Sequence, residues 1–282
     1  MPNVRYEPWC LNSLNLLGRL RCARWHQRRR RLKTVGVFDS GVGGLSVLQA
    51  LLSELPGARF VYAADSAHAP YGERTAQDVS ELTHRVAAVL RAQHGIDALV
   101  VACNTATAHA IDALRLQYPD MPIVGVEPAL KPAAALSRTG HIGVLATRGT
   151  LGSARFARLR DKLLAASPRP LQFHCQPCDG LADAIERHDQ PAVQALCERY
   201  VKEVTHKAGG PNAIDTLVLG CTHYPFAMHE LSRLCGPDVS LVDTGVAVAR
   251  RTREVLGAEA PQPSSLTEPL LLTTGNPAAL TR

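Results

Sequence analysis

Two segments of the chain share one arrangement, a short apolar run that ends in a cysteine and is followed by polar residues. They are residues 98–107, with the sequence ALVVACNTAT, and residues 216–225, with the sequence TLVLGCTHYP. Each apolar run is too short for a helix and rich in valine and leucine, which is typical of a buried parallel strand. Ligands of open α/β sheets bind beyond the carboxyl ends of such strands. The repeat therefore predicts a site where these two strands end.

The two cysteines, Cys103 and Cys221, are more informative together than alone. A single cysteine usually acts as a small buried apolar residue. Two in matching surroundings, 118 residues apart, favour a functional and pseudo-symmetric pair, because the reactivity of a thiol depends on those surroundings. Asn104 and Thr222 follow at positions typical of helix N-caps, where the free N–H groups of a first helical turn point outward.

The rest of the chain from residue 35 alternates between strand and helix patterns, which predicts parallel sheets with right-handed crossovers. Strands are expected at residues 35–38, 60–64, 98–102, 123–126, 141–145, 171–175, 216–219, 239–242 and 270–272. Helices are expected at residues 45–55, 75–94, 104–117, 151–166, 181–187, 191–206 and 246–256, with further helices after Pro128 and Cys221.

The positive charge of the chain is concentrated at its beginning. Residues 1–33 carry nine Lys or Arg and one acid, whereas the remaining residues sum to −2, so the net charge of +6 does not indicate a nucleic-acid-binding body. We expect residues 1–33 to form a disordered basic extension, dispensable for catalysis. Contact with nucleic acid is expected only through this arm.

Eight scattered cysteines in a chain of 282 residues do not form the framework of a small disulfide-rich secreted protein. No apolar run has the length of a membrane span, and no signal peptide is recognisable at the start. These features predict a cytoplasmic protein with reduced thiols and no membrane partner.

Several cofactor classes find no support in the sequence. The turn at residues 39–44, DSGVGG, lacks the lysine and the glycine order of phosphate-binding loops, so we expect it to let the backbone approach a small ligand. Asp39 and Ser40 would then be exposed at the end of a strand. Cys175 and Cys178 have CxxC spacing but no second pair, which favours structural thiols over a zinc site. No metal and no cofactor is expected.

The remaining candidate groups suit proton transfer at a carbon atom. A free thiol has a pKa of about 8.5, and helix N-termini lower it, so one cysteine can be a thiolate while the other keeps its proton. An enzyme that inverts a carbon centre needs such a base on one face and an acid on the other, whereas a hydrolase needs one nucleophile and a paired base. His223, two residues after Cys221, could tune that thiol or move a proton.

At these residues the chain resembles the glutamate racemases, cofactor-independent enzymes of the aspartate/glutamate racemase family that supply D-glutamate for peptidoglycan synthesis, and hence for cell-wall biogenesis and cell shape. The segments that carry the resemblance are FDSGVGG (38–44), PYG (70–72), CNTAT (103–107), GVEPALKPA (125–133), LATRGT (145–150), GCTHYP (220–225) and VDTG (242–245). Members of the family usually have one more helix after the point where this sequence stops.

The resemblance implies a fold of two pseudo-symmetric open-sheet α/β domains with the active site in the cleft between them. Residues 34–125 and 245–282 would form the first domain, and residues 126–244 the second. It also assigns roles to single residues. Catalytic roles fall to Cys103 and Cys221 as acid/base thiols, and to Asp39, His223 and Glu186; contacts with the amino acid fall to Asp39, Ser40, Tyr71, Gly72, Asn104, Thr105, Thr150, Thr222 and His223.

The expected partner is the substrate glutamate, together with the cell-wall precursor UDP-N-acetylmuramoyl-L-alanine as a possible activator, on a monomer or homodimer. Two alternatives stay open. One is a racemase for aspartate or another acidic amino acid, which an arginine aimed at the side-chain carboxylate would favour; Arg74 and Arg148 lie only at the edges of the site segments. The other is a non-catalytic interaction protein on the same fold.

Overall fold

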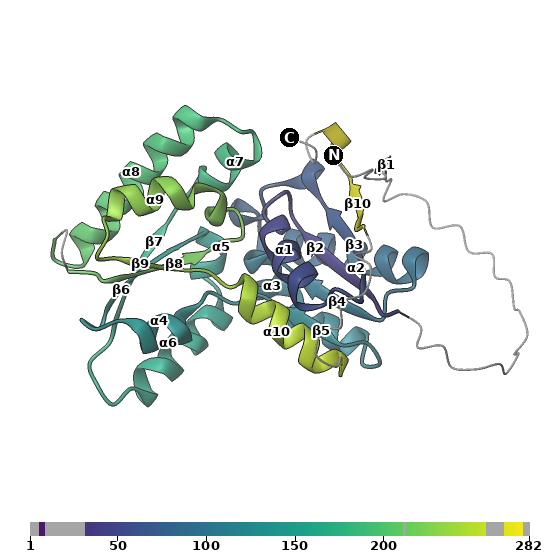
Figure 1. The fold of residues 1–282 in the computed structure, drawn as a ribbon, viewed down its shortest axis with the longest axis horizontal. Helices are drawn as coiled ribbons and strands as arrows, with labels where there is room; N and C mark the ends of the chain where they lie inside the picture. Colours follow the sequence, from purple (N-terminus) through teal and green to yellow (C-terminus); the bar gives the residue numbers. More distant parts are fainter. Residues whose placement is uncertain (1–5, 9–31, 211–212, 258–267, 279–282) are drawn as a thin grey trace, which may run out of the picture.

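The computed structural model describes residues 6–8, 32–210, 213–257 and 268–278. Its strands form two open sheets, one of six strands and one of four, and every strand pairing is parallel. Figure 1 shows the two sheets in two lobes, each covered by helices. This confirms the expected α/β class with open parallel sheets.

The six-stranded sheet has the strand order β1-β10-β3-β2-β4-β5. Its strands are β1 (Tyr6–Pro8), β2 (Thr34–Asp39), β3 (Arg59–Ala64), β4 (Ala98–Val101), β5 (Ile123–Gly125) and β10 (Leu270–Thr273). Its helices are α1 (Leu45–Glu54), α2 (Ala76–His94), α3 (Asn104–Gln117) and α10 (Gly245–Leu256), with the 3-10 turns η1 (Ser66–His68) and η2 (Tyr71–Glu73).

The core of this sheet explains why its strands are apolar throughout. Leu99 and Val101 of β4 pack with α2 and α3, whereas Val100 between them packs with α1 and α10 on the opposite face. Because helices cover both faces, successive side chains are all buried and the alternation seen in half-exposed strands is lost. This is the physical basis of the apolar run before Cys103.

The four-stranded sheet has the order β7-β6-β8-β9. Its strands are β6 (His141–Ala146), β7 (Gln172–Pro177), β8 (Thr216–Gly220) and β9 (Ser240–Val242). Its helices are α4 (Leu130–Leu136), α5 (Arg148–Leu151), α6 (Ala154–Ala166), α7 (Leu181–Glu186), α8 (Gln190–Lys207) and α9 (Met228–Cys235), with the 3-10 turn η3 (Tyr224–Ala227). None of the helices in the described ranges combines the length and the apolar character needed to cross a lipid bilayer.

One expected helix begins later than predicted. The pattern predicts a helix over about residues 151–166, but α5 ends at Leu151 and α6 begins at Ala154 and ends at Ala166 as expected. Ser153 lies between them and accepts a hydrogen bond from Phe156 N–H, as helix N-caps do. The prediction was wrong here because the apolar periodicity continues across the break, while the cap depends on one hydroxyl.

The chain leaves the first sheet after β5 and returns to it with α10 and β10. Helix α10 packs along α1, and β10 pairs with β3. The domain boundaries near residues 125 and 245 remain a prediction.

The first residues depart in part from the expected extension. Tyr6–Pro8 form β1, which pairs in parallel with β10 at the edge of the first sheet. A strand can add there because the outer edge of β10 otherwise presents unpaired N–H and C=O groups. Residues 1–5 and 9–31, and with them most of the basic arm, lie outside the described residues.

Candidate active site

The two cysteines follow matching strands of the two sheets. Cys103 lies two residues after the end of β4, and Cys221 follows β8 directly. Cys103 itself is the N-cap of α3: its Sγ accepts a hydrogen bond from Ala106 N–H at 3.4 Å, and Asn104 is the first helical residue. The expectation that Asn104 would be the cap was therefore wrong by one residue. The thiol lies at the N-terminus of the helix.

Thr222 is not a helix cap either, because the next turn, η3, begins only at Tyr224. Its hydroxyl instead donates to Asp39 Oδ2 at 2.9 Å. Asp39 is the last residue of β2 in the first sheet, so this hydrogen bond joins the surroundings of the two cysteines.

Asp39 and Ser40 were expected to be exposed, and both are buried, with 0% and 4% of their surfaces accessible. The sequence could not show this because the contacts of Asp39 include a residue far away along the chain, Thr222. Asp39 Oδ1 accepts Gly41 N–H at 2.8 Å and lies 3.4 Å from Ser40 Oγ. Burial raises the pKa of Asp39 to about 6, against the opposing charge of His223.

The Cys103 thiol is held in a protonated state by its surroundings. Its Sγ lies 3.7 Å from Ser40 Oγ. Burial, followed by the nearby charge of Asp39, raises the pKa of Cys103 to about 12, although Ala106 N–H opposes the change. The helix N-terminus alone was expected to lower this pKa, but desolvation outweighs it.

The Cys221 thiol has an imidazole beside it. His223 Nδ1 lies 3.7 Å from Cys221 Sγ, and His223 Nε2 lies 2.8 Å from Glu186 Oε2. Burial works to lower the pKa of His223, but the hydrogen bonds to Cys221 and Glu186 raise it well above its ordinary value. The same pairing holds the pKa of Glu186 below its usual range despite burial. His223 and Glu186 therefore form a partly buried ion pair.

The glycine-rich turn brings the first sheet against this ion pair. A Cβ atom at Gly41 would overlap the Glu186 carboxylate, and one at Gly43 would overlap the His223 ring. Val42 N–H donates to Glu186 Oε2 at 2.9 Å. We expected these glycines to let the backbone approach a small ligand. In the structure they let it approach Glu186 and His223 of the other half of the protein.

Three threonine hydroxyls meet across the two halves. Thr105 Oγ1 of α3 lies 2.9 Å from Thr147 Oγ1 and 3.4 Å from Thr150 Oγ1. Thr147 caps α5 by accepting Thr150 N–H at 3.2 Å. The sequence had indicated Thr105 and Thr150 but not Thr147. The sequence did contain a signal for Thr147: it lies in the same LATRGT segment and carries a hydroxyl directly before a helix.

The amide of Asn104 has no hydrogen-bond partner within the described part of the chain, although the residue is only 4% accessible. Buried amides are nearly always paired, so Asn104 is suited to bind a ligand. Tyr71 is also buried, and its hydroxyl donates to Asp65 Oδ2 at 2.6 Å. Gly72 packs against Thr147, where a Cβ would clash.

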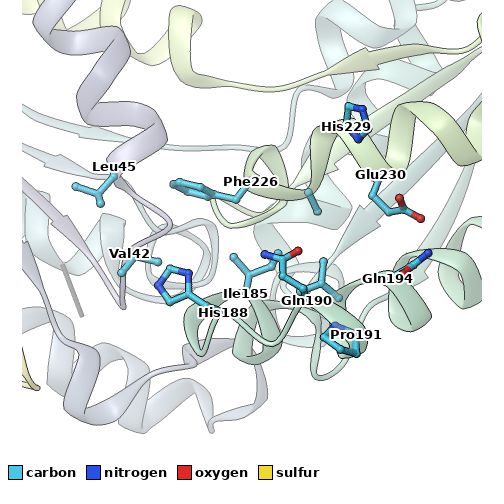
Figure 2. Close-up of a pocket in the computed structure, with 12 residues that line it drawn as sticks. Val42, Leu45, Ile185, His188, Gln190, Pro191, Gln194, Phe226, His229 and Glu230 are labelled. Atoms are coloured by element: carbon cyan, nitrogen blue, oxygen red, sulfur yellow. The ribbon is translucent and has the colours of Figure 1, made fainter. Parts of the chain in front are cut away.

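A separate cavity of about 650 Å³ is lined by residues of α7, α8 and α9 and by Val42 and Leu45. Figure 2 labels Val42, Leu45, His188 and Phe226 among the side chains that line it. None of the residues predicted for the site lines this cavity.

The remaining thiols and acids in the described part of the chain form no metal centre. Cys175 and Cys178 are free thiols. Over the described ranges, no group of three or more His, Cys, Asp or Glu is placed to hold a metal ion.

Comparison with known proteins places this chain in a family. A family model described as Asp/Glu/Hydantoin racemase matches residues 36–252. The chain is 49% identical to the glutamate racemase of Pseudomonas aeruginosa over 228 residues, which cover 80% of this chain and 82% of that protein.

Solved structures agree with this placement. The Escherichia coli glutamate racemase in complex with L-glutamate and the activator UDP-MurNAc-Ala superposes with a TM-score of 0.75 at 33% identity, covering 89% of this chain and 93% of that one. The Francisella tularensis enzyme in complex with D-glutamate gives a TM-score of 0.70 at 26% identity, with 88% and 90% covered. The chain belongs to the Asp/Glu/Hydantoin racemase family.

Proposed function

We propose that this protein is a glutamate racemase that interconverts L- and D-glutamate with two cysteine thiols. The observation that carries the proposal is the pair of cysteines at matching strand ends of two sheets, joined through the Asp39–Thr222 hydrogen bond. Inversion at Cα needs a base and an acid on opposite faces. Relatives named glutamate racemase support the choice of substrate.

The proposed reaction moves one proton off Cα and another onto its opposite face. With L-glutamate, the Cys221 thiolate takes the Cα proton, and the Cys103 thiol donates its own proton to the other face. Cys221 then ends as a thiol and Cys103 as a thiolate, the state from which D-glutamate reacts in reverse. The raised pKa of Cys103 supports its start as the acid, and protonated His223 would stabilise a thiolate at Cys221. Which thiol serves which enantiomer follows the family resemblance.

The substrate would lie among the polar groups that the structure leaves available near the thiols. Asn104 supplies an unpaired buried amide, and Thr105 and Thr150 supply hydroxyls. The alternative of an aspartate racemase gains no support from the two arginines at the edges. Arg148 is exposed and pairs with Asp179, and Arg74 is exposed and donates to the carbonyl of His68.

The proposed product would serve peptidoglycan synthesis, the role that the family resemblance implies. We place the reaction in the cytoplasm, since the chemistry requires reduced thiols and six cysteines in the described ranges are free.

Regulation by the precursor UDP-MurNAc-Ala is a further part of the proposal, since the E. coli relative has been solved with it as activator. A cavity of about 390 Å³ lies where the chain passes from β5 to α4, beside α10. Lys131 and Arg251 line it, together with Arg115 and Arg155, and such cations suit a diphosphate. We assign the activator to this cavity.

The function is tested by incubating the purified protein with L-glutamate or D-glutamate in deuterated water. Proton NMR follows loss of the Cα signal, and circular dichroism follows inversion. We expect both enantiomers to reach the same racemic mixture with deuterium at Cα. Faster turnover of aspartate than glutamate would favour the alternative substrate, and the absence of both signals would refute a racemase.

The activator assignment is tested by adding UDP-MurNAc-Ala to the same assay. We expect the rate to rise, and the rise to be weakened in Lys131→Ala and Arg251→Ala. Lys202→Ala, an exposed change on α8 away from the cavity, is the matched control. A rise that both cavity variants retain in full would place the activator elsewhere.

A further inference from the structure

Asp65 is a buried carboxylate that lies directly after β3, next to the proposed site. None of its surface is accessible. Its backbone N–H donates to the carbonyl of Asp39 at 3.0 Å, so it is anchored to the strand end that carries Asp39. Neither the repeat nor the family segments drew attention to it.

Three side chains converge on this carboxylate. Tyr71 Oη donates to Asp65 Oδ2 at 2.6 Å, and Thr274 Oγ1 donates to Oδ1, also at 2.6 Å. His68 Nδ1 lies 2.9 Å from the same Oδ1. No Lys or Arg in the described part of the chain pairs with Asp65. A buried carboxylate held mainly by hydrogen bonds depends on the geometry of its donors.

Hydrogen bonds of the residues around Asp65 connect it to two other parts of the protein. Ser66 Oγ donates to Glu186 Oε1 at 3.2 Å, which reaches the ion pair beside Cys221. Thr274 follows β10, donates its N–H to the carbonyl of Ala64 at 3.1 Å, and accepts Ala67 N–H at 3.2 Å. The end of the described chain is thereby tied to the loop that carries Tyr71.

The hydrogen bond also decides what Tyr71 can offer a ligand. Burial, and then the charge of Asp65, raise the pKa of Tyr71 far above its ordinary value, so the hydroxyl keeps its proton. That one proton is directed at Asp65. Tyr71 therefore meets a substrate with its ring, its oxygen lone pairs and the backbone of η2, whose position depends on this bond.

We propose that Asp65 is a positioning residue of the racemase: it orients Tyr71 and the η2 loop, and Thr274 locks it in place from the C-terminal strand. The inference rests on the proposed function. Asp65 acts through Tyr71 and does not touch the reacting carbon.

The kinetic test compares Asp65→Asn, Tyr71→Phe and the double variant. Losing a hydrogen bond to a charged group costs about tenfold in an equilibrium constant, so we expect Asp65→Asn to raise KM for both glutamate enantiomers about tenfold, with a smaller change in kcat. In the Tyr71→Phe background the same substitution should change KM less than about twofold, since it acts through the removed hydroxyl.

Asp215→Asn is the matched control. Asp215 is also buried and accepts hydrogen bonds from Ser137 Oγ and from the N–H groups of Arg138 and Thr139, but it lies before β8 in the other sheet. We expect it to lower stability without raising KM. Thr274→Val should raise KM, and Thr274→Ser should restore it. This pair keeps the test decisive if Asp65→Asn does not fold.

A second readout does not require activity. The six tyrosines can be replaced by 3-fluorotyrosine, and the fluorine signal that Tyr71→Phe removes identifies Tyr71. We expect the chemical shift of this signal at neutral pH to change in Asp65→Asn, because the Tyr71 hydroxyl loses its charged acceptor. An unchanged chemical shift, additive KM effects, or a KM rise equal to that of Asp215→Asn would overturn the proposal. An inactive unsubstituted protein would instead refute the racemase function, and the fluorine signal would still decide the Asp65–Tyr71 link.

Discussion

The surroundings of Cys103 and Cys221 differ more than their matching strands suggest. Cys103 caps a helix, lies beside Ser40 and close to the charge of Asp39, and burial raises its pKa to about 12. Cys221 has no such cap, but it has His223 at 3.7 Å, and His223 is paired with Glu186. One side of the site favours a protonated thiol, and the other places a protonated imidazole beside the thiol.

This difference gives the two thiols unequal starting states in a reaction whose equilibrium is symmetric. The equilibrium constant of a racemisation is one, so kcat/KM must be equal in the two directions whatever the surroundings of each thiol. The asymmetry can therefore show only in kcat and KM separately, or in reactions that use a single thiol. β-Elimination from 3-chloroglutamate is such a reaction, because chloride leaves once one base has taken the Cα proton.

The largest expected effect comes from removing either thiol. Cys103→Ser and Cys221→Ser should each lose racemisation by roughly 10²–10⁴-fold or more, since a hydroxyl is a much weaker acid than a thiol. Each variant should still eliminate chloride from one enantiomer of 3-chloroglutamate: the D form with Cys221→Ser and the L form with Cys103→Ser. Cys235→Ser, a free thiol on α9, is the control.

Two outcomes would break the comparison of the two sides. If either serine variant racemised glutamate at the unsubstituted rate, that thiol would have no acid or base role. If both variants lost elimination from the same enantiomer, the assignment of one thiol to each face would be wrong.

A smaller effect is expected from His223→Asn, which removes the cation beside Cys221. Elimination from 3-chloro-L-glutamate should fall about 10²-fold, and elimination from the D form should change far less. Racemisation should fall equally in both directions when measured as kcat/KM. His206→Asn, an exposed change on α8, is the control. Equal losses for both chloro enantiomers would mean that His223 serves both thiols.

The charge of Asp39 is expected to lower the free energy of unfolding, although Asp39 is part of the proposed site. Its pKa in the folded protein is about 6, above the ordinary value of 3.8. The folded state therefore binds the Asp39 proton more tightly than the unfolded state does. The stabilisation that this proton provides is complete below about pH 4 and is lost as the pH rises through about 6. Asp39→Asn should then raise the free energy of unfolding above this range by up to about 3 kcal/mol.

Urea unfolding at about pH 8 and at about pH 4 measures this difference between Asp39→Asn and the unsubstituted protein. The gain should be confined to the higher pH, and activity should be lost at both. A gain of equal size at both values would show that it does not come from the buried charge.

The smallest effect is expected from removing residues 1–31. The deletion takes away β1, which pairs with β10 at the edge of the first sheet, and the basic arm, which carries none of the candidate site residues, so turnover should stay within about threefold and both chloro enantiomers should be affected alike. A modest fall in melting temperature is expected from the newly exposed edge of β10. A hundredfold loss of activity would make the arm part of the site.

Much of the fold could be predicted because buried parallel strands and amphipathic helices leave patterns that extend over many residues. The strands before Cys103 and Cys221 and the long helix α2 are examples, and their observed ends lie within a few residues of those expected. Features that depend on one side chain were missed. The cap at Ser153, the threonine at 147 and the carboxylate at 65 have no periodic signal.

The sequence by itself determined the α/β class, the two strand–cysteine segments and, through the family segments, the candidate site residues. Only the tertiary structure decided their states. Asp39 is buried, Cys103 keeps its proton and His223 pairs with Glu186 because the fold brings together residues that are far apart along the chain. Desolvation and charge act through space over a few ångströms, so a pKa depends on neighbours that are far away along the chain.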